Sequence, residues 1–158
     1  RKTFAVVSVL AIVAGCVGAY EKYGGPFIMI FMGTATVIVY VDENKTYLGG
    51  AIAPGVGISL DALTSKGALL PSIDFKAPEK VISTNTSDCM RSGIMFGTAC
   101  MLDGMIDRFY EQAGKKCKVI ATGGFSQLMA ENCTHRIIAD ENVILDGLKY
   151  IYRKNNKN

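Results

Sequence analysis

The stretch from Phe27 to Tyr40 constrains the fold more than any other part of the sequence. Two apolar runs flank a Gly-Thr-Ala-Thr segment at positions 33–36. Both runs are rich in the β-branched and aromatic residues that suit a pleated, buried surface, so we expect two paired strands joined by a tight turn. The N–H groups and hydroxyls of such a turn point outward together, and donors grouped in this way suit phosphate oxygens. The segment therefore predicts a hairpin with a candidate phosphate-binding loop.

Composition places the chain among globular proteins and excludes one class of partner. Apolar residues make up 49% of the 158 residues and charged residues 20%. This balance predicts a single folded domain over residues 1–158 with a substantial core. The formal net charge is only +3, and the basic residues form no stripe along the sequence. Because nucleic-acid-binding domains carry a basic patch, we expect no nucleic-acid partner.

The cysteines favour a protein of a reducing compartment. Their number is odd, no two of them form a Cys-x-x-Cys pair, and His135 is the single histidine. This set lacks the spacing of a zinc site and of a disulfide framework. We therefore expect free thiols, no metal site and a cytoplasmic location. The cysteines are Cys16, Cys89, Cys100, Cys117 and Cys133.

The first twenty residues allow two interpretations. Two basic residues precede an uncharged run from Thr3 to Ala19, and small residues stand before Cys16. This pattern imitates a bacterial lipoprotein signal, which would make the chain a lipid-anchored protein modified at Cys16. The run also approaches the length of a membrane-spanning helix. We favour the other interpretation, a leading helix over residues 1–24 that is deeply buried in a protein without membrane contact.

Changes in periodicity predict the order of the elements along the chain. An apolar helix comes first, three strand-like runs with short links follow, and helices and strands alternate after Pro54. An irregular arm with few core residues spans residues 71–87, and Thr86, Ser87 and Asp88 offer N-caps to the long helix after it. The predicted helices span residues 4–23, 56–68, 88–113, 125–131 and 141–153, and the predicted strands span 27–32, 36–41, 46–53, 117–121 and 135–139.

This order defines the expected fold class. Three consecutive strands with short links make an antiparallel meander, and two strands reached through helices extend it. The result is an α/β domain with a mixed sheet, in the order β-β-β-α-α-β-α-β-α after the leading helix, and with helices on both faces. That is the ribonuclease-H-like layout from which actin-like kinases are built in pairs.

Six spaced motifs together resemble those of type III pantothenate kinases. They occur in the family's order between about Tyr20 and Asn155, and they correspond to the second half of that enzyme. The resemblance implies ATP-dependent phosphorylation of pantothenate, the first step towards coenzyme A, with Mg and a monovalent cation. It also implies an amino-terminal domain or partner chain that carries a further phosphate loop. The motifs are Gly33–Thr36, Tyr47–Gly55, Leu69–Pro71, Asn85-Thr86 with Ser92–Ile94, Thr122–Gly124 and Leu145–Leu148.

The resemblance assigns nucleotide-binding roles to two short segments. Gly33, Thr34 and Thr36 correspond to the family's loop at the nucleotide phosphates. Gly123 and Gly124 correspond to a turn that approaches the adenosine. Both assignments fit the local chemistry, because hydroxyls and N–H groups bind phosphate and glycines let a flat base pass.

Three positions depart from the family pattern. The family's phosphate loop begins with an acid that helps to hold cations, and Phe31 stands there. Alignment on the segment after the leading helix puts Ala11 at the expected general base and Ile12 at the arginine beside it. Since neither Ala nor Phe can act as a base or a cation ligand, we expect no catalytic residue and no activity from the chain alone. An alternative is a catalytically dead or redesigned domain for structure or oligomerisation, without ATP.

The leading helix also predicts association. Residues 4–19 are apolar around the whole circumference, whereas one sheet face covers roughly half of a helix. Within the chain, the glycine-containing helix 88–113 is the best candidate to cover the rest. If that helix faces outward, two copies can bury both apolar surfaces around a two-fold axis. We therefore expect a homodimer, in which the resemblance assigns Thr86 to the pantothenate pocket of the neighbouring subunit.

Overall fold

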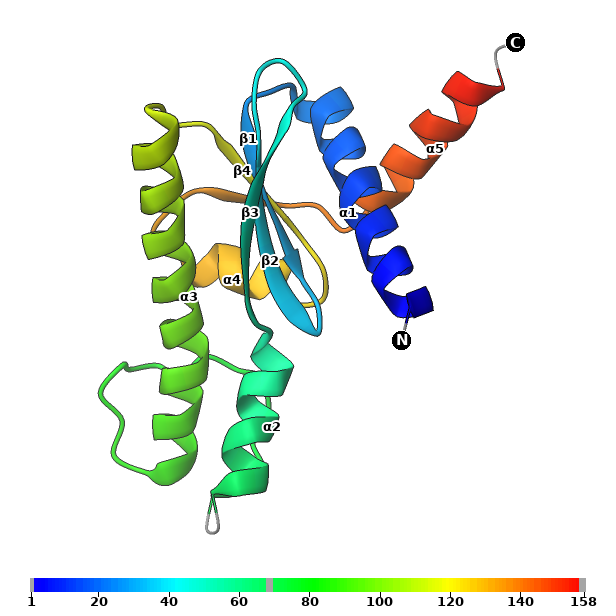
Figure 1. Cartoon of the computed structure of the whole chain (residues 1–158). Coiled ribbons are helices and arrows are strands. Elements are labelled where there is room, and N and C mark those ends of the chain that lie inside the picture. Colours follow the sequence, from blue (N-terminus) through cyan, green and yellow to red (C-terminus); the bar gives the residue numbers. More distant parts are fainter. Residues whose placement is uncertain (1, 68–69, 157–158) are drawn as a thin grey trace.

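The computed structural model describes residues 2–67 and 70–156, and it folds around one mixed sheet (Figure 1). Most predicted elements are found within a few residues of their expected bounds. The helices of the described residues are α1 (Lys2–Tyr23), α2 (Val56–Lys66), α3 (Thr86–Ala113), α4 (Ser126–Asn132) and α5 (Val143–Asn155). The strands are β1 (Phe27–Met32), β2 (Ala35–Val41), β3 (Tyr47–Pro54), β4 (Lys118–Thr122) and β5 (Ile137–Ala139).

The sheet has five strands in the order β3-β2-β1-β4-β5. The meander β1-β2-β3 is antiparallel, and β4 and β5 continue it in parallel with β1. Met32 pairs with Thr36 at the tip of the first hairpin, so the Gly33-Thr34 turn joins β1 and β2 as expected. The predicted mixed α/β sheet is confirmed.

Helices cover both faces of the sheet, and each face has its own core. Figure 1 shows α2, α3 and α4 on one side and α1 and α5 on the other. Side chains alternate along each strand, so Ile28, Ile30 and Met32 of β1 pack towards α3, whereas Phe27, Met29 and Phe31 pack towards α1. The candidate site residues of the hairpin therefore divide between two different environments.

The partner of α1 is α5, and the expectation that the helix at 88–113 would cover α1 is wrong. Helices α1 and α5 cross at close range because Gly18 and Gly147 lack side chains at the crossing point. A Cβ atom on Gly18 would lie 2.0 Å from the carbonyl oxygen of Val143. Helix α3 packs on the opposite face of the sheet, where it contacts α2 and α4 (Figure 1).

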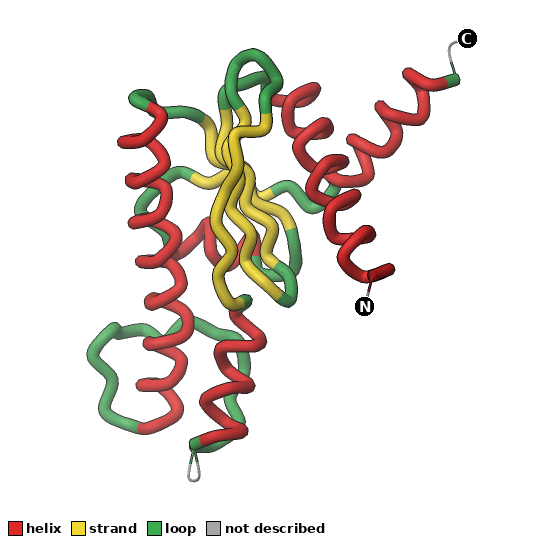
Figure 2. Tube along the Cα trace, viewed as in Figure 1, coloured by secondary structure: helices red, strands yellow, loops and turns green. Residues whose placement is uncertain are grey.

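The long helix begins earlier than predicted. Asn85 is the N-cap, and its side chain accepts a hydrogen bond from the backbone N–H of Asp88 at 2.9 Å. An asparagine in this position satisfies one of the free N–H groups of the first turn. Thr86 and Ser87 therefore belong to α3 and not to the arm. The rest of the arm, from Pro71 to Asn85, runs as a loop beside the first half of α3 (Figure 2).

Part of the apolar surface of α1 stays in contact with solvent. Val9, Leu10 and Val13 are exposed, and the exposed fraction of Leu10 is 60%. Cys16 is half-buried against the core beneath α1, and burial raises the pKa of its thiol to about 11. Among the described residues, no helix is long and apolar enough to cross a membrane.

Candidate functional site

A hollow lies where β1 and β4 end side by side. Parallel strands bring their carboxyl ends to the same edge of a sheet, and ligands of α/β proteins bind outside that edge. The hollow has a cavity volume of about 840 Å³. It is lined by Ala11, Ile12, Phe31, Met32, Gly33, Thr34, Ala35, Val37, Thr122, Gly123, Gly124, Glu141 and Ile144. Four of the five predicted nucleotide-binding residues therefore lie around one cavity.

The Gly33-Thr34 turn is held in place by the start of α2. The N–H of Gly55 donates a hydrogen bond to the carbonyl oxygen of Thr34 at 3.1 Å, and the N–H of Gly33 donates to Ala35 at 3.1 Å. A Cβ atom on Gly55 would lie 2.3 Å from the carbonyl oxygen of Gly33, so only glycine allows this approach. Gly33 and Thr34 themselves remain exposed at the rim of the hollow.

The second wall of the hollow is the turn after β4. Gly123 has φ +107°, a conformation that side chains disfavour, and a Cβ atom there would lie 2.2 Å from the carbonyl oxygen of Met32. The N–H and the hydroxyl of Ser126 both donate to the carbonyl oxygen of Gly123, at 3.0 and 2.7 Å. Gly124 is exposed and has open space around it. The turn is therefore closely packed at Gly123 and open to solvent at Gly124.

The residues that line the hollow carry backbone N–H groups, two threonine hydroxyls and one carboxylate. Within the described residues, the N–H groups of Thr34, Gly123 and Gly124 donate to no protein acceptor. Glu141 is the only charged side chain among the described lining residues, and it is exposed. The cavity can therefore offer hydrogen bonds to oxygen or nitrogen atoms, but its one charged side chain repels anions.

The structure does not bring Thr36 to this cavity. Thr36 is the second residue of β2, and its side chain points to the same face as Met32 and Ile38, towards α2 and α3. It is 0% exposed, and its hydroxyl has no hydrogen-bond partner among the described residues. The alternation of the strand gives the physical reason, because neighbouring residues Ala35 and Val37 take the positions that face the hollow.

The positions expected to hold acids form an apolar wall. Phe31 is only 9% exposed, and its ring packs against Gly15 of α1, where a Cβ atom would lie 2.5 Å from Cε1 of the ring. Ala11 and Ile12 face the hollow from the same helix. Phe31 and Ala11 offer only carbon atoms where the family resemblance implies carboxylate oxygens, and Ile12 carries no charge where it implies an arginine.

The cavity does not fit a divalent cation. Mg²⁺ prefers oxygen ligands, usually one or two carboxylates together with substrate phosphates. The described lining residues provide one carboxylate, that of Glu141. In the described part of the chain, no group of three or more His, Cys, Asp or Glu residues could hold a metal ion.

Thr86 lies apart from the hollow, at the exposed start of α3. The nearest concave surface is a groove of about 620 Å³ between the arm and the first turns of α3. Arg91 holds the arm there through hydrogen bonds to the carboxylate of Asp74, one of 2.8 Å, and Asp88 pairs with the same guanidinium. The hydrogen bonds from Arg91 hold the pKa of Asp74 below its usual range, and those from Asn85 and then Arg91 do the same for Asp88. Thr86 is not among the residues that line this groove.

A buried carboxylate beside the hollow was not predicted from the sequence. Asp140 accepts hydrogen bonds from the Tyr23 hydroxyl at 2.6 Å and from Lys22 Nζ at 2.7 Å. Burial raises the pKa of Asp140, but the bonds from Lys22 and Tyr23 outweigh this and hold the pKa below its ordinary value. Asp140 therefore joins the end of α1 to the start of α5. Its oxygens are already used within the protein, which argues against a role in catalysis.

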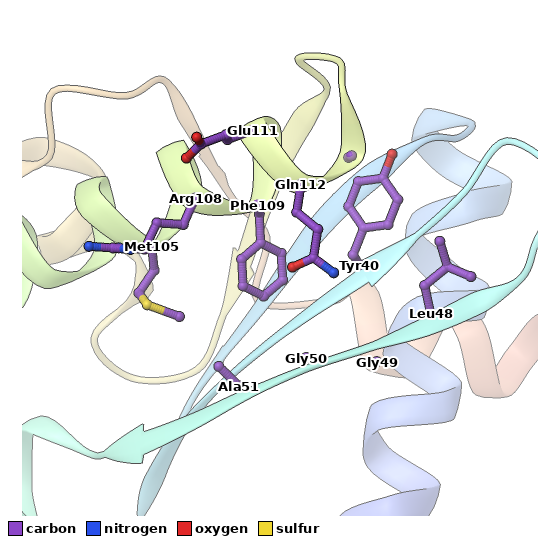
Figure 3. A pocket seen from close by; sticks show the side chains of 11 residues that line it. Tyr40, Leu48, Gly49, Gly50, Ala51, Met105, Arg108, Phe109, Glu111 and Gln112 are labelled. Carbon is purple, nitrogen blue, oxygen red and sulfur yellow. The ribbon is translucent and has the colours of Figure 1, made fainter.

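A further concave surface lies between β3 and the last turns of α3 (Figure 3). It has a volume of about 710 Å³, and Gly49, Gly50 and Ala51 form its floor. Its lining combines the apolar side chains of Phe109 and Met105 with the ring of Tyr40, which carries a polar hydroxyl (Figure 3). None of the residues predicted as site residues lines this surface.

Solved structures identify the class of fold. A "conserved putative Baf family transcriptional activator" from Campylobacter jejuni is similar with a TM-score of 0.63 and 22% identity, over 90% of this chain and 64% of that chain. An activator of 2-hydroxyisocaproyl-CoA dehydratase from Clostridium difficile, solved with bound ADPNP, gives a TM-score of 0.54 and 13% identity, over 94% and 70%. Such likenesses define the fold alone, and it is the ribonuclease-H-like fold of actin-like ATPases.

Sequence relatives identify the family. The family described as "Type III pantothenate kinase" matches residues 12–108. The type III pantothenate kinase of Koribacter versatilis is 42% identical over 146 residues, and that of Moorella thermoacetica is 43% identical over 141 residues. These alignments cover 92% and 88% of this chain but 53% and 55% of the relatives. The chain belongs to the type III pantothenate kinase family, and it spans about half the length of the curated relatives it matches.

Proposed function

We propose that this domain is the nucleotide-binding half of a pantothenate kinase and that it transfers no phosphate by itself. The observation that carries the proposal is the common cavity at the ends of β1 and β4. Gly33, Thr34, Gly123 and Gly124 all line this cavity, and the N–H groups of Thr34, Gly123 and Gly124 have no acceptor among the described residues. Backbone donors at the carboxyl ends of parallel strands suit a nucleotide in this class of fold.

The lack of catalysis follows from the apolar wall. Phosphoryl transfer depends on positioning and on compensation of the developing negative charge. Ala11 and Phe31 supply neither a base nor a cation ligand, and loss of a general base alone lowers rates by about 10²–10⁴-fold. A second domain or chain would have to provide these groups together with a further phosphate loop.

Two measurements test this function. Isothermal titration calorimetry with ATP is expected to show one nucleotide per chain. A coupled assay with ATP and pantothenate is expected to show no turnover by the chain alone. Turnover near the ~1–100 s⁻¹ of ordinary kinases would contradict the proposed inactivity. A flat calorimetric trace, confirmed with adenosine as the titrant, would contradict the nucleotide site.

We also propose that the domain forms a homodimer in the cytoplasm. The exposed apolar side chains of Val9, Leu10 and Val13 support association, because a contiguous apolar surface is rare on a soluble monomer. The five free cysteines support a reducing compartment. In such a dimer, the exposed Thr86 would reach the pantothenate pocket of the other subunit, as the family resemblance suggests.

A further inference from the structure

We infer that the hollow at the ends of β1 and β4 recognises the nucleoside part of its ligand, without help from phosphate charge or from a divalent cation. This inference rests on the proposed nucleotide site and specifies which part of the nucleotide that site binds. It comes from the chemistry of the lining residues, which differs from what a triphosphate requires.

The first argument is electrostatic. A triphosphate carries several negative charges, and proteins bind it with Lys, Arg or a bound cation. Among the described residues that line the hollow there is no Lys, Arg or His. The one charged side chain is that of Glu141, which stands at the start of the segment leading into α5. Its carboxylate would repel phosphate groups at the rim and would favour a neutral ligand.

The second argument concerns shape and polarity. Phe31, Ile12 and Ile144 present apolar surface, and such surface suits the face of a flat heteroaromatic ring. Thr34, Gly123 and Gly124 line the same hollow, and their N–H groups have no acceptor among the described residues. Donors placed in this way can bind the ring nitrogens of a base or the oxygens of a ribose without any charge. A mostly apolar cavity with a few convergent donors is typical of small-molecule sites.

The third argument concerns the cation. Phe31 is packed tightly against Gly15, so the ring cannot move aside to admit a hydrated ion without disturbing the contact between β1 and α1. The remaining carboxylate, Glu141, would be a single ligand where Mg²⁺ needs several oxygens. Added Mg²⁺ should therefore leave the affinity of this cavity unchanged.

NMR titration of the full ¹⁵N-labelled chain tests the inference with adenosine, ATP, and ATP plus MgCl₂. We expect shifts at Gly33, Thr34, Gly123 and Gly124 with all three ligands, and we expect ATP to bind no more tightly than adenosine and at most about tenfold more weakly. ATP binding that is about tenfold or more tighter than adenosine binding, or that tightens when Mg²⁺ is added, would overturn the inference and leave the nucleotide site intact. Absence of shifts with every ligand would overturn the proposed nucleotide site, and the inference with it.

Two variants sharpen the test. Glu141→Gln removes the repulsion, so it should tighten ATP by roughly three- to tenfold and leave adenosine unchanged. Glu111→Gln, an exposed carboxylate on α3, is the matched control and should change neither. Gly124→Ala adds a methyl group at an open position of the turn and should weaken both ligands without unfolding the chain. If Glu141→Gln left ATP affinity unchanged, or if Gly124→Ala left both ligands unaffected, the inference would be wrong.

Discussion

Gly147 of α5 and Ala14 of α1 approach so closely that a Cβ atom on Gly147 would lie 1.8 Å from the carbonyl oxygen of Ala14. The two helices therefore touch backbone to backbone. This contact sets the position of α1 over the sheet, and with it the position of Ala11 and Ile12 in the wall of the hollow. A single methyl group at this crossing should therefore affect both stability and site.

Gly147→Ala should destabilise the protein by about 1–3 kcal/mol or more, because the new methyl group overlaps the backbone of α1. Denaturant unfolding measures this change. Gly97→Ala in α3 is the control, since Gly97 is exposed and a Cβ atom there meets nothing within 4 Å. The control should stabilise the helix by about 0.5–1 kcal/mol. Equal stability of the two variants would show that the helix crossing tolerates a side chain.

Asp140→Asn should destabilise the protein in a pH-dependent way. The pKa of Asp140 is lowered in the folded protein, so its ionised form contributes stability at neutral pH. That contribution is complete above the ordinary carboxyl pKa and is lost as the pH falls through the lowered folded value. We expect the variant to lose about 1–3 kcal/mol at pH 7 and progressively less below about pH 4.

Urea unfolding of both proteins between pH 7 and pH 3 measures the effect of Asp140→Asn. Asp61→Asn on the exposed side of α2 serves as the control and should change stability by less than about 0.5 kcal/mol at any pH. A constant difference between Asp140→Asn and the parent protein across the whole range would mean that Asp140 stabilises the fold by packing and not through its charge.

The proposed homodimer can be examined by sedimentation. The parent chain should sediment as a dimer at micromolar concentration. Leu10→Asp places a charge on an exposed part of α1 and should give soluble, folded monomers. Ile58→Asp makes the same kind of change on α2, on the other side of the sheet, and should leave the dimer intact. A parent chain that sediments as a monomer, or a Leu10→Asp variant that stays dimeric, would refute association through α1.

Phe31→Asp should fail to restore pantothenate phosphorylation. The new carboxylate would enter an apolar wall, Ala11 would still supply no base, and the packing against Gly15 would be lost. We expect destabilisation by about 3–5 kcal/mol, the usual loss when a buried aromatic ring is removed. Phe31→Leu, which keeps the wall apolar, should lose less. Turnover by Phe31→Asp in the coupled assay would show that one acid is enough.

Much of the fold could be predicted from local pattern. The bounds of β1 agree with prediction residue for residue, because Pro26 directly precedes this apolar run and Gly33 directly follows it. The partner of α1 could not be predicted in this way. Which helix covers α1 depends on the close approach of Gly18 and Gly147, and a glycine in a sequence does not indicate which other glycine it meets.

The candidate site, like the fold, was predicted only in part. Gly33, Thr34, Gly123 and Gly124, which the family motifs assign to the nucleotide, line one cavity, since both segments follow strands that end at the same edge of the sheet. Thr36 was grouped with them by motif, although the two-residue period of β2 puts it on the face of Ile38. Glu141 was not predicted as a site residue, because it belongs to none of the six motifs. Only the folded structure shows that it lines the cavity.

The pairing of α1 with α5 also has a consequence for how the chain acquires its structure. During synthesis α1 is made before the five strands of the sheet, and its covering helix α5 is made after them. The apolar surface of α1 that packs on α5 therefore stays uncovered until α5 has been made, and this contact joins residues as far apart in the sequence as Gly18 and Gly147. Contacts of such long sequence separation form slowly. We therefore expect nascent chains that stop before α5 to need a chaperone or to aggregate, even though their sheet residues are all present.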